Sequence, residues 1–378
     1  MNAMTTIRTV IGLMSGTSMD GIDVALIRTD GEAVQEFGPS ASYPFTDADR
    51  ETLRAALGEA RALDDRAARP GVLGTAEELV TGRHAEAVTR FLAERGIARE
   101  DVALVGFHGQ TVFHDPARKL TVQIGDGEAL AQSLQLPVAW DFRADDVAAG
   151  GQGAPLVPIF HRALMATAGL TAPAVFVNIG GVSNVTFIGR DDALLAFDTG
   201  PGNALMDDWT RERTGRAFDA DGELAASGTV ETERLARLLS HDFFDVTPPK
   251  SLDRDAFSSA ALAGLSDADG ATTLLHFTAR SIARAAEHFP EAAGDWVVCG
   301  GGRHNRELMR VLGGLVAQAG GRLRSAEDVG LDGDATEAQA FAYLAARTAD
   351  GKPISFPGTT GAPVPLTGGR ISRPSAQR

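Results

Sequence analysis

Hydrophobic and polar positions alternate in blocks along this chain, and the blocks predict strands and helices in a recurring order. Two apolar runs at residues 10–14 and 24–27 flank a polar turn of Ser, Gly, Thr and Asp. Apolar runs joined by such a turn predict a β-hairpin. Two charged segments rich in Ala and Leu, 47–66 and 76–94, predict surface helices. Three further short apolar runs predict strands at 102–107, 120–125 and 137–140.

The second half of the chain begins as the first does. Apolar runs at 175–178 and 184–188 flank a Gly-Gly-Val-Ser turn, and another apolar run follows at 194–197. The remaining segments predict one strong strand at 296–299 and helices at 202–214, 272–289, 305–317 and 335–349. The same order of elements in both halves predicts a duplicated α/β architecture of two lobes with a cleft between them.

The boundary between the two lobes is expected near residue 170. The first lobe then comprises residues 1–169 and the second comprises residues 170–378. The tail after Gly351 is rich in Gly and Pro and is therefore expected to be coil. Whether this tail packs back on the first lobe is left open.

Composition limits the classes of protein to which the chain can belong. Its 378 residues, 44% of them hydrophobic and 22% charged, are typical of a globular protein of about two domains. A net charge of −15 argues against a nucleic acid or an anionic membrane as the main partner. The single cysteine, Cys299, excludes an internal disulfide. With no signal peptide or membrane-spanning run in the sequence, the cytoplasm is the expected location.

The first polar turn carries the residue types of a nucleotide-phosphate loop. Gly16 and Gly21 allow backbone N–H groups to approach a ligand, because no Cβ intervenes. Hydroxyl groups follow Gly16, and Asp20 and Asp23 supply carboxylates that suit a hydrated magnesium ion. The alternative is an ordinary exposed turn.

Two more glycine-rich turns follow strands in the second half. Asp198 ends an apolar strand and precedes a Gly-rich entry into a helix, where α/β proteins often place catalytic groups. Asp198 suits the role of a general base, and the alternative is a cap of the following helix. The strand at 296–299 is followed by Gly300, Gly301 and Gly302. Because glycines have no side chains, a ligand can lie directly against the backbone of this turn.

Glu337 has an adequate structural explanation from the sequence alone. Asp334 as helix N-cap and Glu337 three residues later fit a capping box. The eight histidines show no metal-ligand spacing, and neither a P-loop nor a G-x-S-x-G motif is present.

With these residues in view, the chain resembles the anhydro-N-acetylmuramic acid kinases, which belong to the superfamily of sugar kinases, actin and Hsp70 ATPases. The resemblance runs from the first strand to the last helix. The motifs of the first half are GLMSGTSMDGID at 12–23, GFHGQT at 106–111, VQIGD at 122–126, DFR at 141–143 and AAGGQGAPL at 148–156. Those of the second half are NIGGVSN at 178–184, FDTGPGN at 197–203, CGGGRHN at 299–305 and DATEAQAF at 334–341.

The resemblance implies a fold and a reaction. The fold would be two lobes of duplicated actin-like or ribonuclease H-like topology with the active site in the cleft. The enzyme would use ATP, Mg²⁺ and water to open the ring of 1,6-anhydro-N-acetylmuramic acid and phosphorylate O6. The product would be N-acetylmuramic acid 6-phosphate, in the recycling of peptidoglycan. A homodimer is also implied.

The resemblance further implies roles for individual residues. Asp198 would be the catalytic base that activates water. The ATP phosphates would be bound by Gly16, Thr17, Ser18, Met19, Asp20, Gly21, Ile22 and Asp23. The nucleotide would also lie along Gly300, Gly301 and Gly302. Substrate contacts would come from His108, Gln110, Asn184 and Glu337. Asp20 or Asp23 would hold the metal ion through water.

Three alternatives remain open at this point. A kinase for another sugar would act on glucose or N-acetylglucosamine and not on the anhydro sugar. A nucleotide-driven binding protein similar to actin or Hsp70 would polymerise or capture a partner, although no peptide-binding domain or helical lid follows the second lobe. A purely structural protein does not explain three glycine-rich turns at strand ends.

Overall fold

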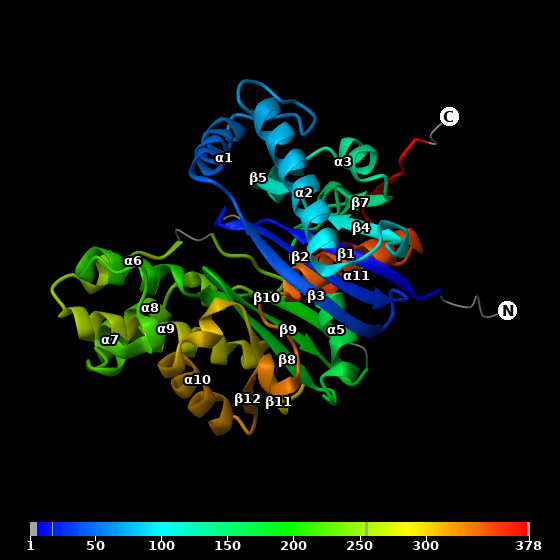
Figure 1. Ribbon diagram of the computed structural model, residues 1–378. Coiled ribbons are helices and arrows are strands. Elements are labelled where there is room, and N and C mark those ends of the chain that lie inside the picture. Colours follow the sequence, from blue (N-terminus) through cyan, green and yellow to red (C-terminus); the bar gives the residue numbers. More distant parts are fainter. Residues whose placement is uncertain (1–5, 17, 192, 254–255, 376–378) are drawn as a thin grey trace. The chain divides into compact units, whose positions relative to one another are not determined.

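The computed structural model describes residues 6–16, 18–191, 193–253 and 256–375. The chain divides into two compact units, the first comprising Met1–Leu164 and Ala335–Arg378 and the second comprising Met165–Asp334. Residues 335–378 thus belong with the N-terminal part of the chain (Figure 1). The division expected from the sequence, 1–169 and 170–378, keeps them with the second lobe.

The first unit is built on a mixed six-stranded sheet in the order β13-β7-β4-β1-β2-β3. Its strands are β1 (Arg8–Met14), β2 (Gly21–Thr29), β3 (Val34–Pro44), β4 (Leu104–Phe107), β7 (Val138–Trp140) and β13 (Arg370–Ser372). The pairs β1–β2 and β2–β3 are antiparallel, and β1–β4 and β4–β7 are parallel. The hairpin predicted at the start of the chain is therefore confirmed as β1–β2.

Helices cover both faces of this sheet. On one face, α1 (Asp47–Ala60) and α2 (Leu73–Arg95) bury the apolar side chains that alternate along the strands, such as Ile11 and Leu13. On the opposite face, α11 (Thr336–Ala349) packs on β1, β2 and β4. Both predicted surface helices of the first half are thus present. Helix α1 begins at a capping box formed by Thr46 and Asp49.

Two glycines allow α11 to lie close to the sheet. Gly12 of β1 and Gly106 of β4 lie opposite each other in the sheet register. A Cβ on Gly12 would overlap the carbonyl oxygen of Ala338, and one on Gly106 would overlap that of Phe341. Because the helix backbone occupies the space of a side chain, only glycine fits at both positions.

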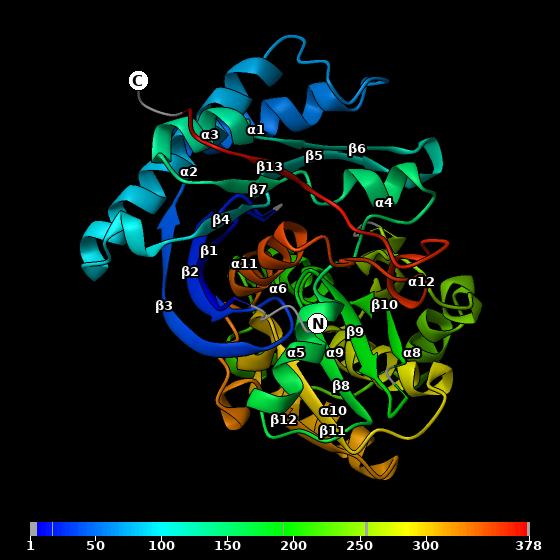
Figure 2. The same ribbon diagram turned by 90° about the vertical axis from the view of Figure 1, so that its right-hand side faces the viewer.

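The rest of the first unit comprises a separate two-stranded sheet, two short helices and the C-terminal tail. The hairpin of β5 (Gln110–Asp115) and β6 (Leu120–Ile124) leads into α3 (Gly127–Leu134) and α4 (Ala144–Ala148). The tail after Gly351 is more ordered than the expected coil, since it contains α12 (Pro357–Thr360) and β13. Strand β13 pairs antiparallel with β7 (Figure 2).

The second unit repeats the strand arrangement of the first. Its sheet has the order β10-β9-β8-β11-β12. The strands are β8 (Ala174–Ile179), β9 (Val182–Ile188), β10 (Leu194–Pro201), β11 (Asp295–Cys299) and β12 (Arg322–Ser325). The first three are antiparallel, and β11 and β12 run parallel to β8. This corresponds strand for strand to β3-β2-β1-β4-β7, so the predicted α/β fold with duplicated topology is confirmed.

The helices of the second unit bury one face of its sheet. They are α6 (Ala204–Thr214), α7 (Glu223–Ala226), α8 (Thr232–Leu239), α9 (Asp267–Arg284) and α10 (Arg306–Gln318). Alternate strand residues, among them Val177, Val185 and Phe197, join the hydrophobic core below these helices. The residues that alternate with these along each strand therefore project from the other face of the sheet. Helix α5 (Pro158–Thr167) spans the boundary of the two units in sequence.

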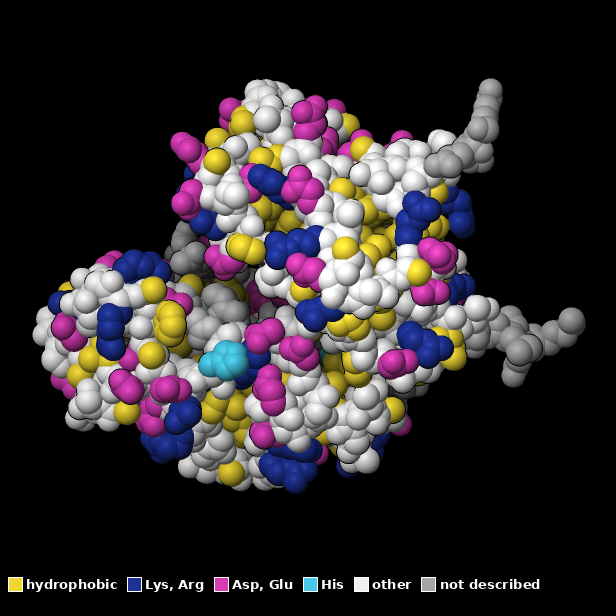
Figure 3. Space-filling model, in the orientation of Figure 1, with side chains coloured by type: hydrophobic (Ala, Val, Ile, Leu, Met, Phe, Trp, Pro, Cys, Tyr) yellow, Lys and Arg dark blue, Asp and Glu magenta, His cyan; other side chains and the backbone are white. Residues whose placement is uncertain are grey.

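Charged side chains of both signs are interspersed on the face of the units seen in Figure 3. Among the described helices, none combines the length and apolar character that crossing a membrane requires.

Candidate active site

The turn between β1 and β2 is held by the turn that follows β4. The Ser15 hydroxyl donates to the carbonyl oxygen of Gly109 at 3.2 Å, and Gln110 Nε2 donates to that of Gly16 at 3.0 Å. Buried Met19 adopts a positive φ of 57°, and its N–H also donates to the Gly16 carbonyl, at 3.1 Å. The structure thus brings Gln110 to the predicted phosphate loop.

Gly16 and Gly21 of this turn differ in the space that surrounds them. A Cβ on Gly21 would lie 2.6 Å from the carbonyl oxygen of Tyr43, so strand packing accounts for this residue. A Cβ on Gly16 would lie no closer than 3.6 Å to any neighbouring atom, which leaves the space beside it accessible to a ligand. Thr17, also predicted to contact the phosphates, lies outside the described residues.

The carboxylates proposed for a metal ion lie at the end of this turn. Asp20 is exposed, and Asp23 is partly buried on β2 opposite Met14. Within the described residues, no group of three His, Cys, Asp or Glu side chains is arranged to hold a metal ion. Carboxylate oxygens are ligands that Mg²⁺ takes together with water and phosphate oxygens.

A second cluster in the first unit joins His108, Arg143 and Glu337. His108 Nδ1 contacts its neighbour's carbonyl oxygen, that of Gly109, at 2.7 Å and therefore carries the proton. Nε2 then accepts from Arg143, whose Nε and Nη2 lie at 3.1 and 3.0 Å. Burial and the Arg143 charge hold the pKa of His108 well below its usual value, so the ring is a neutral acceptor that orients the guanidinium.

The guanidinium of Arg143 is fixed on a second side and is electrostatically coupled to Glu337. Its Nη1 donates to the carbonyl oxygen of Gly153 at 2.8 Å, and burial lowers the pKa of Arg143 to about 10. Burial, with a contribution from Asp23, raises the pKa of Glu337, and the Arg143 charge opposes this shift. Glu337 is surrounded by many protein atoms, which is the burial that raises its pKa, yet the residue keeps solvent-accessible surface through which a ligand can reach it.

The capping box expected at Asp334 and Glu337 is wrong. Helix α11 begins after Ala335, which makes no side-chain cap hydrogen bond. Asp334 instead accepts from Arg303 Nη2 at 2.8 Å in the second unit. The structural explanation of Glu337 therefore no longer holds, while its coupling to Arg143 and Asp23 favours a functional role.

In the second unit, Asp198 is part of a polar row across three strands. Asn184 of β9 lies directly opposite Asp198 of β10, and Asn178 of β8 lies directly opposite Asn184. Side chains at opposed positions project from the same face of a sheet with Cβ atoms about 5 Å apart. The row lies on the face opposite the helices, and all three residues are partly exposed. The strand register thus places Asn184 beside Asp198.

The Asp198 carboxylate is held by a segment far along the chain. Leu252 N–H donates to Oδ2 at 2.7 Å, and the backbone N–H of Asp198 donates to the Lys250 carbonyl oxygen at 3.0 Å. Burial raises the pKa of Asp198 to about 6, and the Leu252 hydrogen bond opposes the shift. The capping alternative is wrong, because α6 begins after Asn203. Asp198 is therefore ionised near pH 7 and more basic than an ordinary aspartate.

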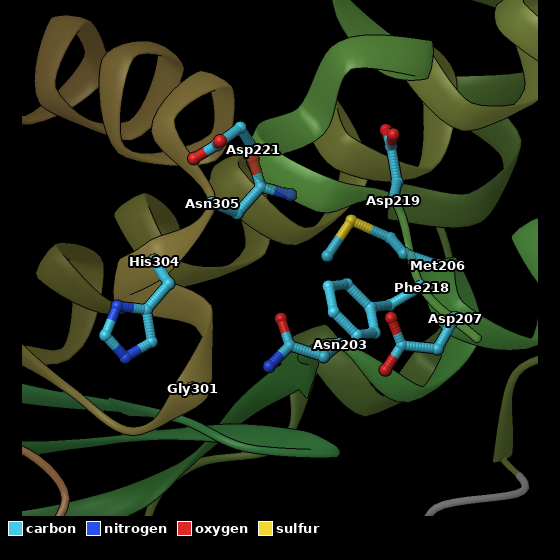
Figure 4. A pocket seen from close by; sticks show the side chains of 9 residues that line it. All are labelled: Asn203, Met206, Asp207, Phe218, Asp219, Asp221, Gly301, His304 and Asn305. Atoms are coloured by element: carbon cyan, nitrogen blue, oxygen red, sulfur yellow. The ribbon is translucent and has the colours of Figure 1, made fainter. Parts of the chain in front are cut away.

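The turn after β11 forms one wall of a cavity of about 460 Å³ within the second unit. Gly302 approaches Ile179 so closely that a Cβ would overlap it, whereas a Cβ on Gly301 would meet only Asn203 Nδ2, at 3.7 Å. Figure 4 shows Asn203, Met206 and Phe218 lining the cavity on one side and His304 on the other. Phe218 is 59% exposed, which is unusual for so large an apolar residue.

Sequence reasoning missed four residues of these clusters. Asn178 and Arg143 lie in motifs quoted for the resemblance, but only strand pairing and the fold of residues 143–153 place them beside Asn184 and His108. Lys250 and Leu252 carry no motif that points to Asp198, which lies about 50 residues earlier. A polar residue at the end of a buried strand is the one signal that favours Asn178.

The duplicated mixed sheet, with glycine-rich turns after its first and fourth strands, defines an α/β protein of the ribonuclease H-like class. The profile of a family described as anhydro-N-acetylmuramic acid kinase matches residues 8–373. The chain belongs to the anhydro-N-acetylmuramic acid kinase family.

Two relatives agree with this assignment. The anhydro-N-acetylmuramic acid kinase of Nitrobacter winogradskyi is 55% identical over 366 residues, which are 97% of this chain and 100% of the relative. That of Rhodopseudomonas palustris strain BisB18 is 54% identical with the same coverage. A solved structure of the activator of 2-hydroxyisocaproyl-CoA dehydratase from Clostridium difficile with bound ADPNP matches 91% of this chain and 96% of its own, with a TM-score of 0.42 and 11% identity.

Proposed function

We propose that this protein is a kinase that uses ATP and water to convert 1,6-anhydro-N-acetylmuramic acid into N-acetylmuramic acid 6-phosphate in peptidoglycan recycling. Membership of the family supports the reaction. The assignment of the general base depends on Asp198. Burial raises the pKa of this aspartate to about 6, and its side chain lies in a row with the amide side chains of Asn184 and Asn178.

Asp198 acts as the general base in this proposal. A water molecule loses a proton to the carboxylate and attacks the anomeric carbon, which breaks the bond from C1 to O6. The electron pair of that bond stays on O6, which takes the γ-phosphoryl group while ADP leaves. The amides of Asn184 and Asn178 offer hydrogen bonds beside the base and suit the positioning of water or sugar hydroxyls.

The cluster of the first unit is assigned to the sugar. N-acetylmuramic acid carries a carboxylate, for which the fixed guanidinium of Arg143 is a suitable partner. Glu337 is assigned to a sugar hydroxyl, since the residue keeps solvent-accessible surface. His108 orients Arg143 through its neutral Nε2, and Gln110 fixes the phosphate loop through Gly16.

The nucleotide is assigned to two glycine-rich turns. The turn from Gly16 to Asp23 is assigned to the phosphates, because the space beside Gly16 is open. Asp20 or Asp23 would hold Mg²⁺ through water, and this ion would neutralise the charge of the phosphates. The cavity beside Gly301 is assigned to the adenine base of ATP, whose flat ring suits stacking on the exposed Phe218. A homodimer is also part of the proposal.

The test is to incubate the purified protein with ATP, Mg²⁺ and 1,6-anhydro-N-acetylmuramic acid. The mass of the sugar product is then determined by mass spectrometry. The proposal predicts a gain of one phosphate and one water. A gain of phosphate without water would contradict ring opening. Consumption of ATP with an unchanged sugar would favour a nucleotide-driven binding protein, and phosphorylation of glucose or N-acetylglucosamine alone would favour a kinase for another sugar.

A further inference from the structure

Residues 250–252 form a strap along the outer side of β10, the edge strand that carries Asp198. The carbonyl oxygen of Lys250 accepts from the Asp198 N–H at 3.0 Å, and the N–H of Leu252 donates to Asp198 Oδ2 at 2.7 Å. The strap thus contacts both the backbone and the carboxylate of Asp198. Among the described donors, none contacts the other carboxylate oxygen, Oδ1. Holding Oδ2 therefore orients Oδ1.

Among the described residues, no strand pairs with the strap on the side away from β10, and a side-chain contact helps to hold it in place. The Lys250 side chain supplies this contact. Its Nζ donates to the carbonyl oxygens of Phe243 and Phe244 at 3.1 and 3.4 Å. The ammonium also lies 4.7 Å from the centre of the Phe243 ring and 6.0 Å from that of Phe197. Phe243, Phe244 and Phe197 all belong to the core of the second unit.

The charged groups around Lys250 come from three elements. His288 Nε2 lies 3.5 Å from Nζ. Burial and Arg284 lower the pKa of Lys250, while Asp245 and Glu287 raise it. Among the described residues, no ionisable side chain contributes to the pKa shift of Asp198, which comes from burial and the opposing Leu252 hydrogen bond. A change at Lys250 therefore reaches Asp198 through the strap.

We propose that Lys250 is a positioning residue for the reaction, because it anchors the strap whose Leu252 N–H orients the Asp198 carboxylate. This inference rests on the proposed function, in which Asp198 is the base. Without the anchor, the Leu252 donor leaves Oδ2 for part of the time, and the carboxylate loses its fixed orientation. Since a hydrogen bond to a carboxylate favours the charged form, the pKa of Asp198 then rises above about 6.

The experiment compares the pH dependence of turnover in the full-length wild type, Lys250→Met and Lys250→Arg. Lys250→Met is expected to lower kcat about tenfold and to move the acidic limb of the profile up by about one pH unit, with KM nearly unchanged. Lys250→Arg keeps a cation that can donate hydrogen bonds. It is therefore expected to retain most of the wild-type kcat and the wild-type position of the acidic limb. Lys119→Met, which removes an exposed lysine of the first unit, is the matched control and should behave as the wild type.

A merely structural role for Lys250 would lower the melting temperature without moving the acidic limb, and that result would overturn the proposal. Leu252→Pro removes the N–H donor directly and should produce the same shift, which keeps the proposal testable if Lys250→Met does not fold. Carbon-13 NMR of the aspartate carboxyl groups, with Asp198→Asn to assign the signal, measures the Asp198 titration without turnover. If the wild type forms no product, the proposed function fails, yet an unshifted titration in Lys250→Met would independently reject the positioning role.

Discussion

Asn184 and Asp198 lie directly opposite each other on β9 and β10, so an amide and a carboxylate share one face of the second sheet. The strand register alone sets this relationship, because a shift of one residue would turn one of the two side chains into the hydrophobic core. A base placed on a paired strand, with a further hydrogen bond from Leu252, has little freedom to reorient.

Asp198→Asn is expected to keep the fold and to lower kcat by a factor of about 10² or more, the scale of a general base. The amide is close in shape to the carboxylate, and Leu252 N–H can still donate to its oxygen. Turnover measured by product formation, alongside thermal unfolding, tests this. Near-normal activity in Asp198→Asn would reject Asp198 as the base.

The pH dependence of turnover follows from the same residue. Burial raises the pKa of Asp198 to about 6, and only the ionised form accepts a proton from water. Turnover should therefore be near its plateau at pH 7 and fall as the pH drops through 6, to about one tenth of the plateau at pH 5. A profile of kcat/KM from pH 5 to 8 gives this midpoint. A flat profile down to pH 5 would mean that no group with this pKa is required.

Glu337→Gln is expected to raise the KM for the sugar about tenfold and to leave the melting temperature nearly unchanged. A hydrogen bond to a charged group contributes about 1.5–3 kcal/mol, which corresponds to at least a tenfold change in binding. Stability should persist because Glu337 caps no helix. Glu128→Gln, also an exposed glutamate in the first turn of a helix, is the matched control. A loss of stability without a change in KM would return Glu337 to a structural role.

The sequence predicts the local elements well, since apolar alternation and glycine-rich turns are local signals. The β1–β2 hairpin, α1 and the turn after β11 all follow from such patterns. The failure at Asp334 is equally informative. Its spacing to Glu337 fits a capping box, but the Asp334 side chain pairs with Arg303, more than 30 residues away along the chain. A long-range ion pair decides the outcome, and a motif of four residues contains no information about it.

Much of the candidate site depends on similar long-range contacts. Asp198, Asn184 and the glycines are visible as residue types at strand ends, whereas the row with Asn178 requires the pairing of three strands. The sequence predicts that Gly21 makes room for a ligand, but the nearby Tyr43 carbonyl oxygen accounts for the glycine. Residue type indicates what a position allows, and only the tertiary contacts decide which of the allowed roles it has.

Gly106→Ala is expected to destabilise the first unit by about 1–3 kcal/mol or more, the scale of overpacking in a core. The added Cβ would overlap the Phe341 carbonyl oxygen in α11, and this helix backbone cannot give way as a flexible side chain would. Because α11 carries Glu337 in its first turn, a displaced helix should also raise the KM for the sugar.

Gly58→Ala is the matched control for this variant. Gly58 lies exposed in α1, and its added Cβ would meet no atom within 4 Å. Since alanine favours a helix interior over glycine by about 0.5–1 kcal/mol, Gly58→Ala should be slightly more stable than the wild type. Thermal and urea unfolding of both variants measures the difference. If Gly106→Ala were as stable as Gly58→Ala, the close approach of α11 to β4 would not be the reason for glycine at this position.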